Sequence, residues 1–479
     1  MESGATVDRE YGPYIDGSFH DGIEQFEVLN PATNEPVATV WESGPDRVDQ
    51  AIQSSLRAQP DWAAMDGAER GELLFDLADA IRENRERFAR IDTLENGQVL
   101  AATKGRTNGV ANYFEFFAGV ADKVEGETIP VDGDRLDYTL REPLGVTAQI
   151  VPWNAPTILA ARGFAPALAA GNTVVAKADP KTPLGVLELA ELASEVGFPD
   201  GVINVVPGDV EETGQPLSGD DRVDGLVFTG SRRGGEAVMK AAAESIVPVM
   251  LELGGKSPSL VFPDADVEKA LEGTVNVFNN AGQVCFATTR LFVHESIYDE
   301  FTDRLVERVE ALSVGPGDED HDIGPLASPE AQDRVATYVD GAVENGARLL
   351  AGGEIPREEG NFYAPTVIDR VDDDAAISCE EVFGPVLTVY EFSDEEEALE
   401  RANDTDYGLY ATVWTTDLRR AHRLAGELEA GTVSVNEFPA VPTAAPFGGY
   451  KTSGIGREGG LQALEHYTQL KNVIVNLEE

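Results

Sequence analysis

Between residues 146 and 252, short apolar runs alternate with longer stretches of helical periodicity. The apolar runs are VTAQIVPWN, NTVVAKAD, GVINVVPG, DGLVFTGS and IVPVMLELGG. This alternation is typical of a parallel β-sheet with helices on both faces, in which ligands bind at the carboxyl ends of the strands. We therefore predict an α/β fold of the Rossmann type. Lys177, Gly230 and Glu252 each come at the end of an apolar run, so we expect them at the binding edge.

A chain of 479 residues is too long for a single hydrophobic core, so we expect at least two domains. Residues 66–95 carry apolar side chains at helical spacing, which predicts one or two amphipathic helices. A second region of strands and helices follows residue 253 without a long linker. Residues 125–143 have strand character around an Asp-Gly turn, and we expect them to pair with the alternating tail QLKNVIVNLEE as an oligomerisation arm.

The net charge narrows the choice of partners. The chain has 86 acidic and 36 basic residues, which gives a formal charge of −50. Such a field repels phosphate backbones and anionic lipids, so we expect neither nucleic acid nor a membrane as a partner. The scattered carboxylates resemble those of proteins from halophilic organisms, in which concentrated salt screens the repulsion. We expect low salt to destabilise the fold.

The cysteines indicate a reducing compartment. Two cysteines cannot make a disulfide framework, and the sequence has neither a signal-like first segment nor a long apolar window. These features favour a cytoplasmic protein.

Three residues are candidates for chemistry, each with a structural alternative. Cys285 lies in FNNAGQVCFATTR, where backbone amides at a helix start would activate a thiol; the alternative is an inert buried cysteine. Glu252 has apolar neighbours that raise a carboxyl pKa toward that of a general base, or it caps the next turn. Asn154, in PWNAP, offers an amide to an oxyanion or makes an Asx turn. Cys379 precedes Glu380, whose charge disfavours a thiolate, so we interpret it as packing.

Two glycine-rich stretches are candidates for binding a dinucleotide. GIGREG, at residues 454–459, matches G-x-G-x-x-G, but we reject it because too little sequence follows for a βαβ unit. FTGSRRGG, at residues 228–235, places Gly230 where a strand meets a helix start, which favours a pyrophosphate. An ordinary βα turn is the alternative. Lys177 at a neighbouring strand end favours the cofactor interpretation, because its ammonium needs an anion or hydroxyls.

Five stretches resemble the signature motifs of the aldehyde dehydrogenase superfamily in order and spacing. They are PWNAP, LELGGKSP, FNNAGQVC, EEVFGPV and PFGGYKTSGIGRE, and the resemblance runs from Tyr14 to Val475. It implies a Rossmann-type cofactor domain, an α/β catalytic domain and a β-hairpin oligomerisation arm, assembled as a homodimer or homotetramer. The implied domains are residues 1–124 and 144–252 for the cofactor, 253–452 for catalysis, and 125–143 with 453–479 for the arm and C-terminal tail.

The resemblance also implies a reaction. Cys285 attacks an aldehyde, and Asn154 and the Cys285 backbone N–H hold the oxyanion. Hydride transfer to the nicotinamide then leaves a thioester, and Glu252 activates the water that hydrolyses it. A CoA-acylating semialdehyde dehydrogenase is the alternative enzyme, although such members usually lack the glutamate at Glu252; a binding protein that has lost catalysis is the third. No metal is expected.

For the cofactor, the resemblance implies NAD(P)⁺. The contacts that it implies are Trp153, Lys177, Gly230, Ser231, Glu381 and Phe383. Pro180 stands where NAD-preferring members often carry a glutamate, and Arg232 and Arg233 follow Ser231. These departures favour NADP⁺ over NAD⁺, unless both arginines simply face solvent.

The substrate is an aldehyde whose class the resemblance leaves open. Phe286 and Phe447 would form an apolar tunnel, and the PWNAP variant resembles that of members that act on aromatic aldehydes. Arg162 aligns with an arginine that grips the distal carboxylate of semialdehydes. Asn279 replaces the usual partner arginine, which weakens the carboxylate interpretation.

Overall fold

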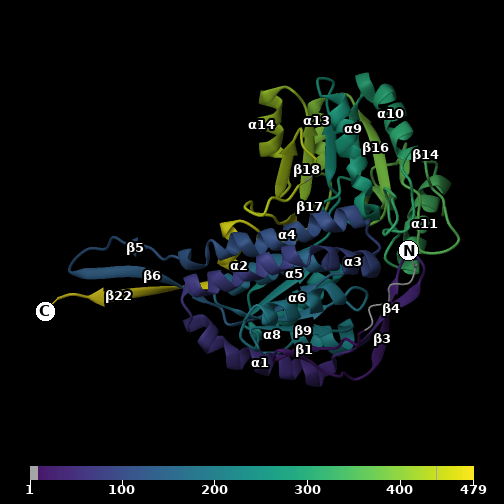
Figure 1. Ribbon diagram of the computed structural model, residues 1–479. Helices are drawn as coiled ribbons and strands as arrows, with labels where there is room; N and C mark the ends of the chain where they lie inside the picture. The colour runs from purple at the N-terminus through teal and green to yellow at the C-terminus, as the bar shows by residue number, and fades with distance from the viewer. Residues whose placement is uncertain (1–8, 439, 479) are drawn as a thin grey trace.

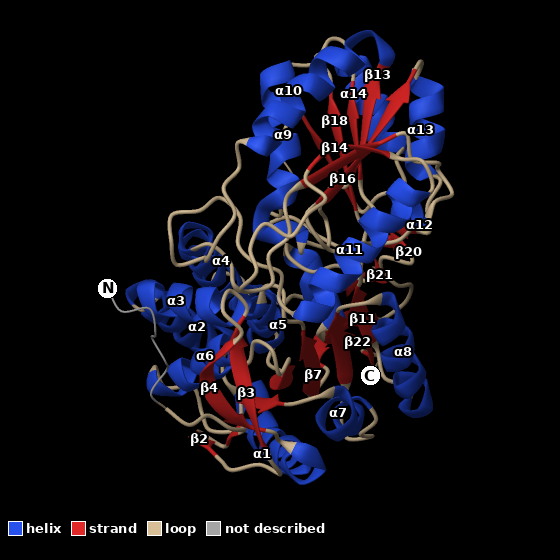
Figure 2. Cartoon of the chain, turned by 90° about the vertical axis from the view of Figure 1, so that its right-hand side faces the viewer, coloured by secondary structure: helices blue, strands red, loops and turns tan. Residues whose placement is uncertain are grey.

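The computed structural model describes residues 9–438 and 440–478 and contains two α/β sheets and a projecting arm (Figures 1 and 2). The first sheet carries the apolar runs of residues 146–252, and the second sheet begins soon after residue 253. The predicted α/β class is therefore confirmed. No helix in the described part of the chain is long and apolar enough to span a bilayer.

The first sheet has the strand order expected for a Rossmann-type fold. In spatial order it consists of β2 (Ser18–Phe19), β1 (Tyr14–Ile15), β9 (Ile203–Pro207), β8 (Thr173–Ala178), β7 (Val146–Val151), β10 (Gly225–Thr229), β11 (Val249–Glu252) and β21 (Gly454–Ile455). Strands β9 to β11 of this order are parallel. The chain runs outward from β7 in one direction, then resumes at β10 on its other side. This reversal creates the crevice at which such sheets bind ligands.

Helices cover both faces of the first sheet. They are α1 (Gly44–Ala64), α2 (Gly67–Glu83), α3 (Arg85–Asn96), α4 (Leu100–Ala118), α5 (Pro156–Ala169), α6 (Leu184–Glu195), α7 (Gln215–Ser218) and α8 (Arg232–Ser245). One apolar core joins α2 to α6 with the sheet, and a second core joins α1 and α8 to its opposite face. The helical periodicity of residues 66–95 corresponds to α2 and α3, whose Leu74, Leu77 and Ile81 are buried.

The second sheet is also largely parallel. Its spatial order is β14 (Arg348–Ala351), β15 (Thr366–Asp369), β16 (Val386–Phe392), β13 (Arg290–His294), β12 (Pro258–Val261), β18 (Tyr410–Trp414) and β19 (Thr432–Val435). Its helices are α9 (Val267–Val275), α10 (Tyr298–Glu310), α11 (Pro329–Glu344), α12 (Ala376–Cys379), α13 (Glu395–Asn403) and α14 (Leu418–Glu427). A separate apolar core fills this region. The step from β11 to β12 carries the chain from one sheet to the other, at the boundary expected near residue 252.

The arm extends away from both sheets (Figure 1). It consists of β5 (Thr128–Ile129), β6 (Arg135–Pro143) and β22 (Thr468–Asn476), all antiparallel, with Thr468 opposite Pro143. The predicted pairing of residues 125–143 with the tail is thus confirmed. Several apolar side chains of the arm remain exposed, namely Leu136, Leu140, Leu470 and Ile474. Of the expected stretch 453–479, β21 joins the first sheet rather than the arm.

Two short hairpins complete the described elements. Strands β3 (Gln25–Asn30) and β4 (Glu35–Trp41) pair near the N-terminus, and β17 (Tyr407–Gly408) pairs with β20 (Tyr450–Lys451). The rejected glycine motif at residues 454–459 lies in β21 and the loop after it, not in a βαβ unit. The prediction that this glycine motif lies outside a βαβ unit is therefore confirmed.

Candidate active site

A cavity of about 510 Å³ lies where the two α/β regions meet, and Cys285 opens into it. Its walls come from α4, from the start of α5 after β7, from the segment that leads to and includes Cys285, and from Phe438, Val441, Pro442 and Thr443 after β19. Apolar side chains of Ile158, Leu159, Val441 and Phe438 contribute much of the lining. The cavity therefore offers a thiol at one wall of a largely apolar space.

Cys285 does not lie at a helix start, which corrects the expectation that helical amides activate its thiol. It follows the 3₁₀ segment Asn276–Gly282, in which Asn280 (φ 53°) and Ala281 (φ 50°) are left-handed. These two residues break the helical path, and the chain continues into a turn and then β13. The nucleophile loop is thus shaped by left-handed residues rather than by a helix dipole.

The surroundings of Cys285 favour the neutral thiol. Burial, opposed by Arg162 and supported by the carboxylates of Glu381 and Glu252, raises the pKa of Cys285 to about 12. A thiol with such a pKa contributes almost no thiolate at neutral pH. Nucleophilic attack at this site therefore needs a base that removes the proton.

Hydrogen bonds of its side chain and of its backbone hold Asn154 beside the loop that carries Cys285. Its Nδ2 donates to the backbone O of Gln283 at 3.0 Å. Its backbone O accepts from Nε2 of Gln98 at 2.7 Å and from Nδ2 of Asn280 at 3.0 Å. Because an amide nitrogen has two hydrogens, one donor of Asn154 stays available toward the cavity. This is the arrangement that an oxyanion needs.

Glu252 ends β11 as a buried carboxyl group without a hydrogen-bond partner. The residue is 4% exposed, and neither carboxylate oxygen has a partner among the described residues. Burial raises its pKa well above the usual value, and the nearby Glu458 raises it further. Isolated buried carboxyl groups are costly, so such groups are characteristic of functional sites. The structure thus favours the base interpretation over a turn cap.

Arg162 is already paired inside the protein. Its Nη2 lies 2.5 Å from Oε2 of Glu458, and both side chains are less than one-tenth exposed. Its guanidinium also lies 4.8 Å from the ring centre of Phe447. Arg162 borders the cavity, but Glu458 neutralises its charge. A grip on a substrate carboxylate by Arg162 would have to compete with this ion pair.

Phe286 lines the cavity, whereas Phe447 lies behind it. The two rings meet edge to face at 5.9 Å, and Phe447 is only 2% exposed. Phe447 is absent from the cavity wall, which corrects the expectation that it forms the tunnel with Phe286. The aromatic side chains on the wall are Phe286, Phe438 and Tyr113.

Two glycines after Glu252 allow loops of the second region to approach. A Cβ on Gly254 would lie 2.2 Å from a carboxylate oxygen of Glu381, and one on Gly255 would lie 2.5 Å from the backbone O of Cys285. The Gly255 N–H donates to Oε1 of Glu381 at 3.0 Å. Burial raises the pKa of Glu381 to about 7, partly offset by this hydrogen bond. Any side chain at these two positions would push the nucleophile loop and Glu381 away.

Trp153 and Phe383 join the two regions at the opposite side of Asn154. Their rings meet edge to face with centres 5.5 Å apart. The backbone O of Trp153 accepts from Nδ2 of Asn96 at 2.8 Å and from Oγ1 of Thr182 at 3.2 Å. Trp153, expected at the cofactor, is thus the chain neighbour of Asn154, and its ring contacts that of Phe383.

The expected adenosine and pyrophosphate contacts gather at the carboxyl edge of the first sheet. Lys177 lies in β8, is 4% exposed, and has its pKa lowered by burial. Gly230 follows β10, and Ser231 caps α8 by accepting from the Gly234 N–H at 3.2 Å. A buried ammonium and a helix N-terminus at the same edge of the sheet fit the hydroxyls and phosphates of a dinucleotide. The residues present therefore suit NAD⁺ or NADP⁺.

The two arginines of α8 differ in their partners. Arg232 pairs with Glu236 and with Asp406 at 2.9 Å. Arg233 is exposed and has no ion pair within the described residues. Pro180, which follows β8, brings no carboxylate to this edge. Arg233 is therefore the side chain whose charge is available to a ligand.

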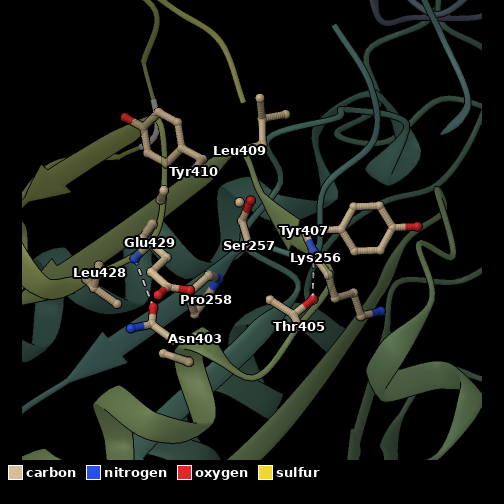
Figure 3. A pocket seen from close by; sticks show the side chains of 14 residues that line it. Lys256, Ser257, Pro258, Asn403, Thr405, Tyr407, Leu409, Tyr410, Leu428 and Glu429 are labelled. Atoms are coloured by element: carbon tan, nitrogen blue, oxygen red, sulfur yellow. Dashed lines mark hydrogen bonds between the residues drawn. The ribbon is translucent and has the colours of Figure 1, made fainter. Parts of the chain in front are cut away.

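A second, small cavity lies beside Lys256 of the LELGGKSP motif (Figure 3). It holds about 10 Å³, and Asn403, Thr405 and Tyr407 line it with Lys256. This is room for about one water molecule. Burial lowers the pKa of Lys256 to about 7. Within residues 9–438 and 440–478, no cluster of three or more His, Cys, Asp or Glu side chains could hold a metal ion.

Comparison with known protein families shows to which family the chain belongs. The profile described as "Aldehyde dehydrogenase family" matches residues 19–473, which is nearly the whole chain. This chain is an aldehyde dehydrogenase family member. It oxidises an aldehyde to the carboxylic acid, with a pyridine nucleotide as hydride acceptor.

Individual relatives are similar to this chain over nearly the whole of both sequences. A betaine aldehyde dehydrogenase of Cereibacter sphaeroides is 45% identical over 94% of this chain and 93% of its own. A (Z)-2-((N-methylformamido)methylene)-5-hydroxybutyrolactone dehydrogenase of Acinetobacter baylyi is 42% identical over 98% of each chain. The solved NAD⁺ complex of an aldehyde dehydrogenase from Bacillus cereus superposes with a TM-score of 0.97, at 42% identity, over 99% of this chain and 98% of that one.

Several residues of this aldehyde dehydrogenase site escaped the sequence analysis. Glu458 lies in the glycine loop that was rejected as a dinucleotide motif, and only the fold brings it next to Arg162. Arg106 of α4 lines the cavity, as do Tyr113 and Phe438. A cation one helical turn from an apolar stripe is an ordinary surface pattern, so no local signal identifies Arg106.

Proposed function

We propose that Cys285, Asn154 and Glu252 carry out the oxidation in the roles that the family resemblance implies. The supporting observation is that Glu252, a buried carboxyl group without a partner among the described residues, acts electrostatically on the Cys285 thiol, although Glu252 lies outside the cavity wall. Glu252 accepts the thiol proton, directly or through a water molecule, as Sγ of Cys285 bonds to the aldehyde carbon. Asn154 Nδ2 and the Cys285 N–H donate to the resulting oxyanion.

The second half of the proposed reaction is hydrolysis. Bound NAD(P)⁺ supplies the hydride acceptor, and loss of the hydride leaves a thioester on Cys285. Glu252 first releases the thiol proton to solvent, and then takes a proton from a water molecule that attacks the thioester carbon. The carbon–sulfur bond breaks to release the acid, and the proton held by Glu252 returns to the Cys285 thiolate. The presence of Glu252 favours hydrolysis over transfer of the acyl group to CoA.

We propose NADP⁺ as the preferred cofactor, with NAD⁺ also accepted. Lys177 would hold the adenosine ribose, and Ser231 with the N–H groups at the start of α8 would hold the pyrophosphate. Arg233 supports the preference, because its guanidinium is exposed at this edge without an ion pair in the described part of the chain. Pro180 supports it too, since a proline cannot repel a 2′-phosphate as a carboxylate would. Glu381 and Phe383 would contact the nicotinamide ribose.

We propose that the arm makes the protein a homodimer or homotetramer. The exposed Leu136, Leu140, Leu470 and Ile474 support this, because apolar side chains on a projecting sheet are stabilised by a second subunit. Replacing Leu470 and Ile474 with aspartate should give smaller particles in light scattering.

Both cysteines are free, which supports a reducing, cytoplasmic location. The charge of −50 supports a halophilic origin.

The test of the proposed reaction is cofactor reduction in concentrated KCl, with NAD⁺ and NADP⁺ in parallel and aliphatic, aromatic and carboxylated aldehydes. Cys285→Ala should abolish turnover, while the matched Cys379→Ala should retain it. Cys379 is exposed, which corrects the expectation that it serves packing, and it is not part of the cavity wall. Turnover that survives Cys285→Ala would remove Cys285 as the nucleophile.

A further inference from the structure

Arg106 is a cation in the substrate cavity with donors to spare. It lies on α4 and contributes to the wall that also includes Cys285. Its Nη1 is buried and has no hydrogen-bond partner among the described residues. Removing a guanidinium from water without giving it acceptors is costly, so natural proteins seldom leave one in this state.

The other arginine of the cavity is in a different state. Nε and Nη2 of Arg162 also lack a hydrogen-bond partner, but Arg162 forms an ion pair with Glu458 and lies over the ring of Phe447, so its charge is neutralised. Arg106 forms no ion pair within the described residues. Asp92 acts on it electrostatically, but Oδ1 of Asp92 accepts from Oγ1 of Thr157 at 2.6 Å instead. Asp92 thus stabilises the charge of Arg106 without occupying its donors.

We propose that Arg106 binds a carboxylate at the far end of the substrate, so that this enzyme acts on aldehydes that carry an acid group. This inference rests on the proposed function, because it takes Cys285 as the residue that attacks the aldehyde. The planar guanidinium donates two parallel hydrogen bonds to a carboxylate, which supplies the missing acceptors of Arg106. The apolar side chains of Ile158, Leu159 and Phe438 contact the carbon atoms between the two ends.

The same cation disfavours a positively charged substrate. Several relatives are named betaine aldehyde dehydrogenases, and betaine aldehyde carries a quaternary ammonium group. An ammonium group in this cavity would meet Arg106 in a low-dielectric space, where like charges repel strongly. We therefore expect this enzyme to differ from those relatives in the sign of the charge that it accepts at the far end of the substrate.

The experiment compares aldehydes that differ only in that charge. The pairs are para-carboxybenzaldehyde with its methyl ester and succinate semialdehyde with its methyl ester, at one KCl concentration. In the wild type, kcat/KM should favour each acid over its ester. Arg106→Gln should lower this preference by about 10- to 100-fold, mainly through KM, and Arg106→Lys should restore part of it.

Lys104→Gln is the matched control. It removes a positive charge from the same helix, but Lys104 pairs with Glu86 and lies outside the cavity wall. It should leave the acid-to-ester preference unchanged. A purely structural role for Arg106 would instead lower kcat/KM for acids and esters equally, and that result would overturn the inference.

A binding measurement keeps this inference separate from the reaction itself. Titration calorimetry with terephthalate and its dimethyl ester needs no turnover. Arg106→Gln should weaken terephthalate by about tenfold or more and leave the dimethyl ester, which has no carboxylate, unchanged. Equal affinities in wild type and variant would overturn the carboxylate site even if aldehydes are oxidised. Failure of every aldehyde to react, with this difference intact, would count against the proposed function alone.

Discussion

Arg162 and Glu458 form an ion pair in the interior, with Nη2 and Oε2 2.5 Å apart. The contact is an ion pair rather than an aligned hydrogen bond, since neither atom has a hydrogen-bond partner among the described residues. Glu458 also raises the pKa of Glu252, second only to the effect of burial. This pair therefore affects both the charge of Arg162 at the cavity wall and the proton affinity of the proposed base.

Glu458→Gln should move the pH dependence of turnover. A general base works when it is deprotonated, so the rate rises with pH through the pKa of Glu252. Without the negative charge of Glu458 this pKa falls, and the acidic limb should move to lower pH. Rates across a pH series measure the shift, with the exposed Glu465→Gln as control. An acidic limb that stays in place or moves upward would contradict the coupling.

The same variant should be less stable. Glu458→Gln leaves Arg162 as a buried cation without its carboxylate, which costs about 3–5 kcal/mol in comparable cases. Thermal unfolding should show a lower midpoint than in the wild type. An unchanged midpoint would mean that water or another group solvates Arg162 in the variant.

Glu252→Gln should separate the two halves of the reaction. Glutamine keeps the shape of the side chain but cannot accept a proton, so hydrolysis of the thioester should slow by about 10²-fold or more. If water or hydroxide can deprotonate Cys285 in its place, a first burst of reduced cofactor remains. Stopped-flow absorbance follows both phases. A steady rate equal to that of the wild type would exclude Glu252 as the hydrolytic base.

Arg233→Gln should weaken NADP⁺ more than NAD⁺. Loss of a charge-assisted hydrogen bond to the 2′-phosphate predicts a rise of about tenfold in the KM for NADP⁺ and little change for NAD⁺. Arg232→Gln is the control, because Arg232 is already paired with Asp406. Equal changes for both cofactors would indicate that Arg233 simply faces solvent.

Salt should stabilise the fold. With a net charge of −50, repulsion between carboxylates is screened over about 10 Å at 0.1 M salt and over about 3 Å at 1 M. The unfolding midpoint should therefore rise steadily with KCl. A midpoint that is the same in dilute and concentrated KCl would contradict the halophilic interpretation.

The sequence predicted the elements that depend on local pattern. Apolar runs end where the strands end, so Lys177, Gly230 and Glu252 were placed correctly at the carboxyl edge of the first sheet. The arm followed from an exposed hairpin and an alternating tail. These predictions succeed because a strand or helix that is buried on one face or on both carries apolar residues at a regular spacing along the chain.

The contents of the cavity could not be predicted in the same way. The left-handed conformation of Asn280 and Ala281, which removes Cys285 from a helix start, depends on packing against distant loops. Phe447 is a large apolar residue of the kind that lines a tunnel, but its position behind Phe286 is determined by the tertiary structure. Arg106 and Glu458 are single charges whose burial comes from contacts between elements far apart in the chain.

The arm also imposes an order on synthesis. Lys471 of β22 lies 2.5 Å from Glu142 of β6, although 329 positions separate them along the chain. While the ribosome is still translating the second α/β region, β6 has only the two-residue β5 as a neighbour, and its other edge is open. Open strand edges recruit foreign strands. A nascent chain must therefore keep this edge free of other polypeptides until β22 emerges and closes it.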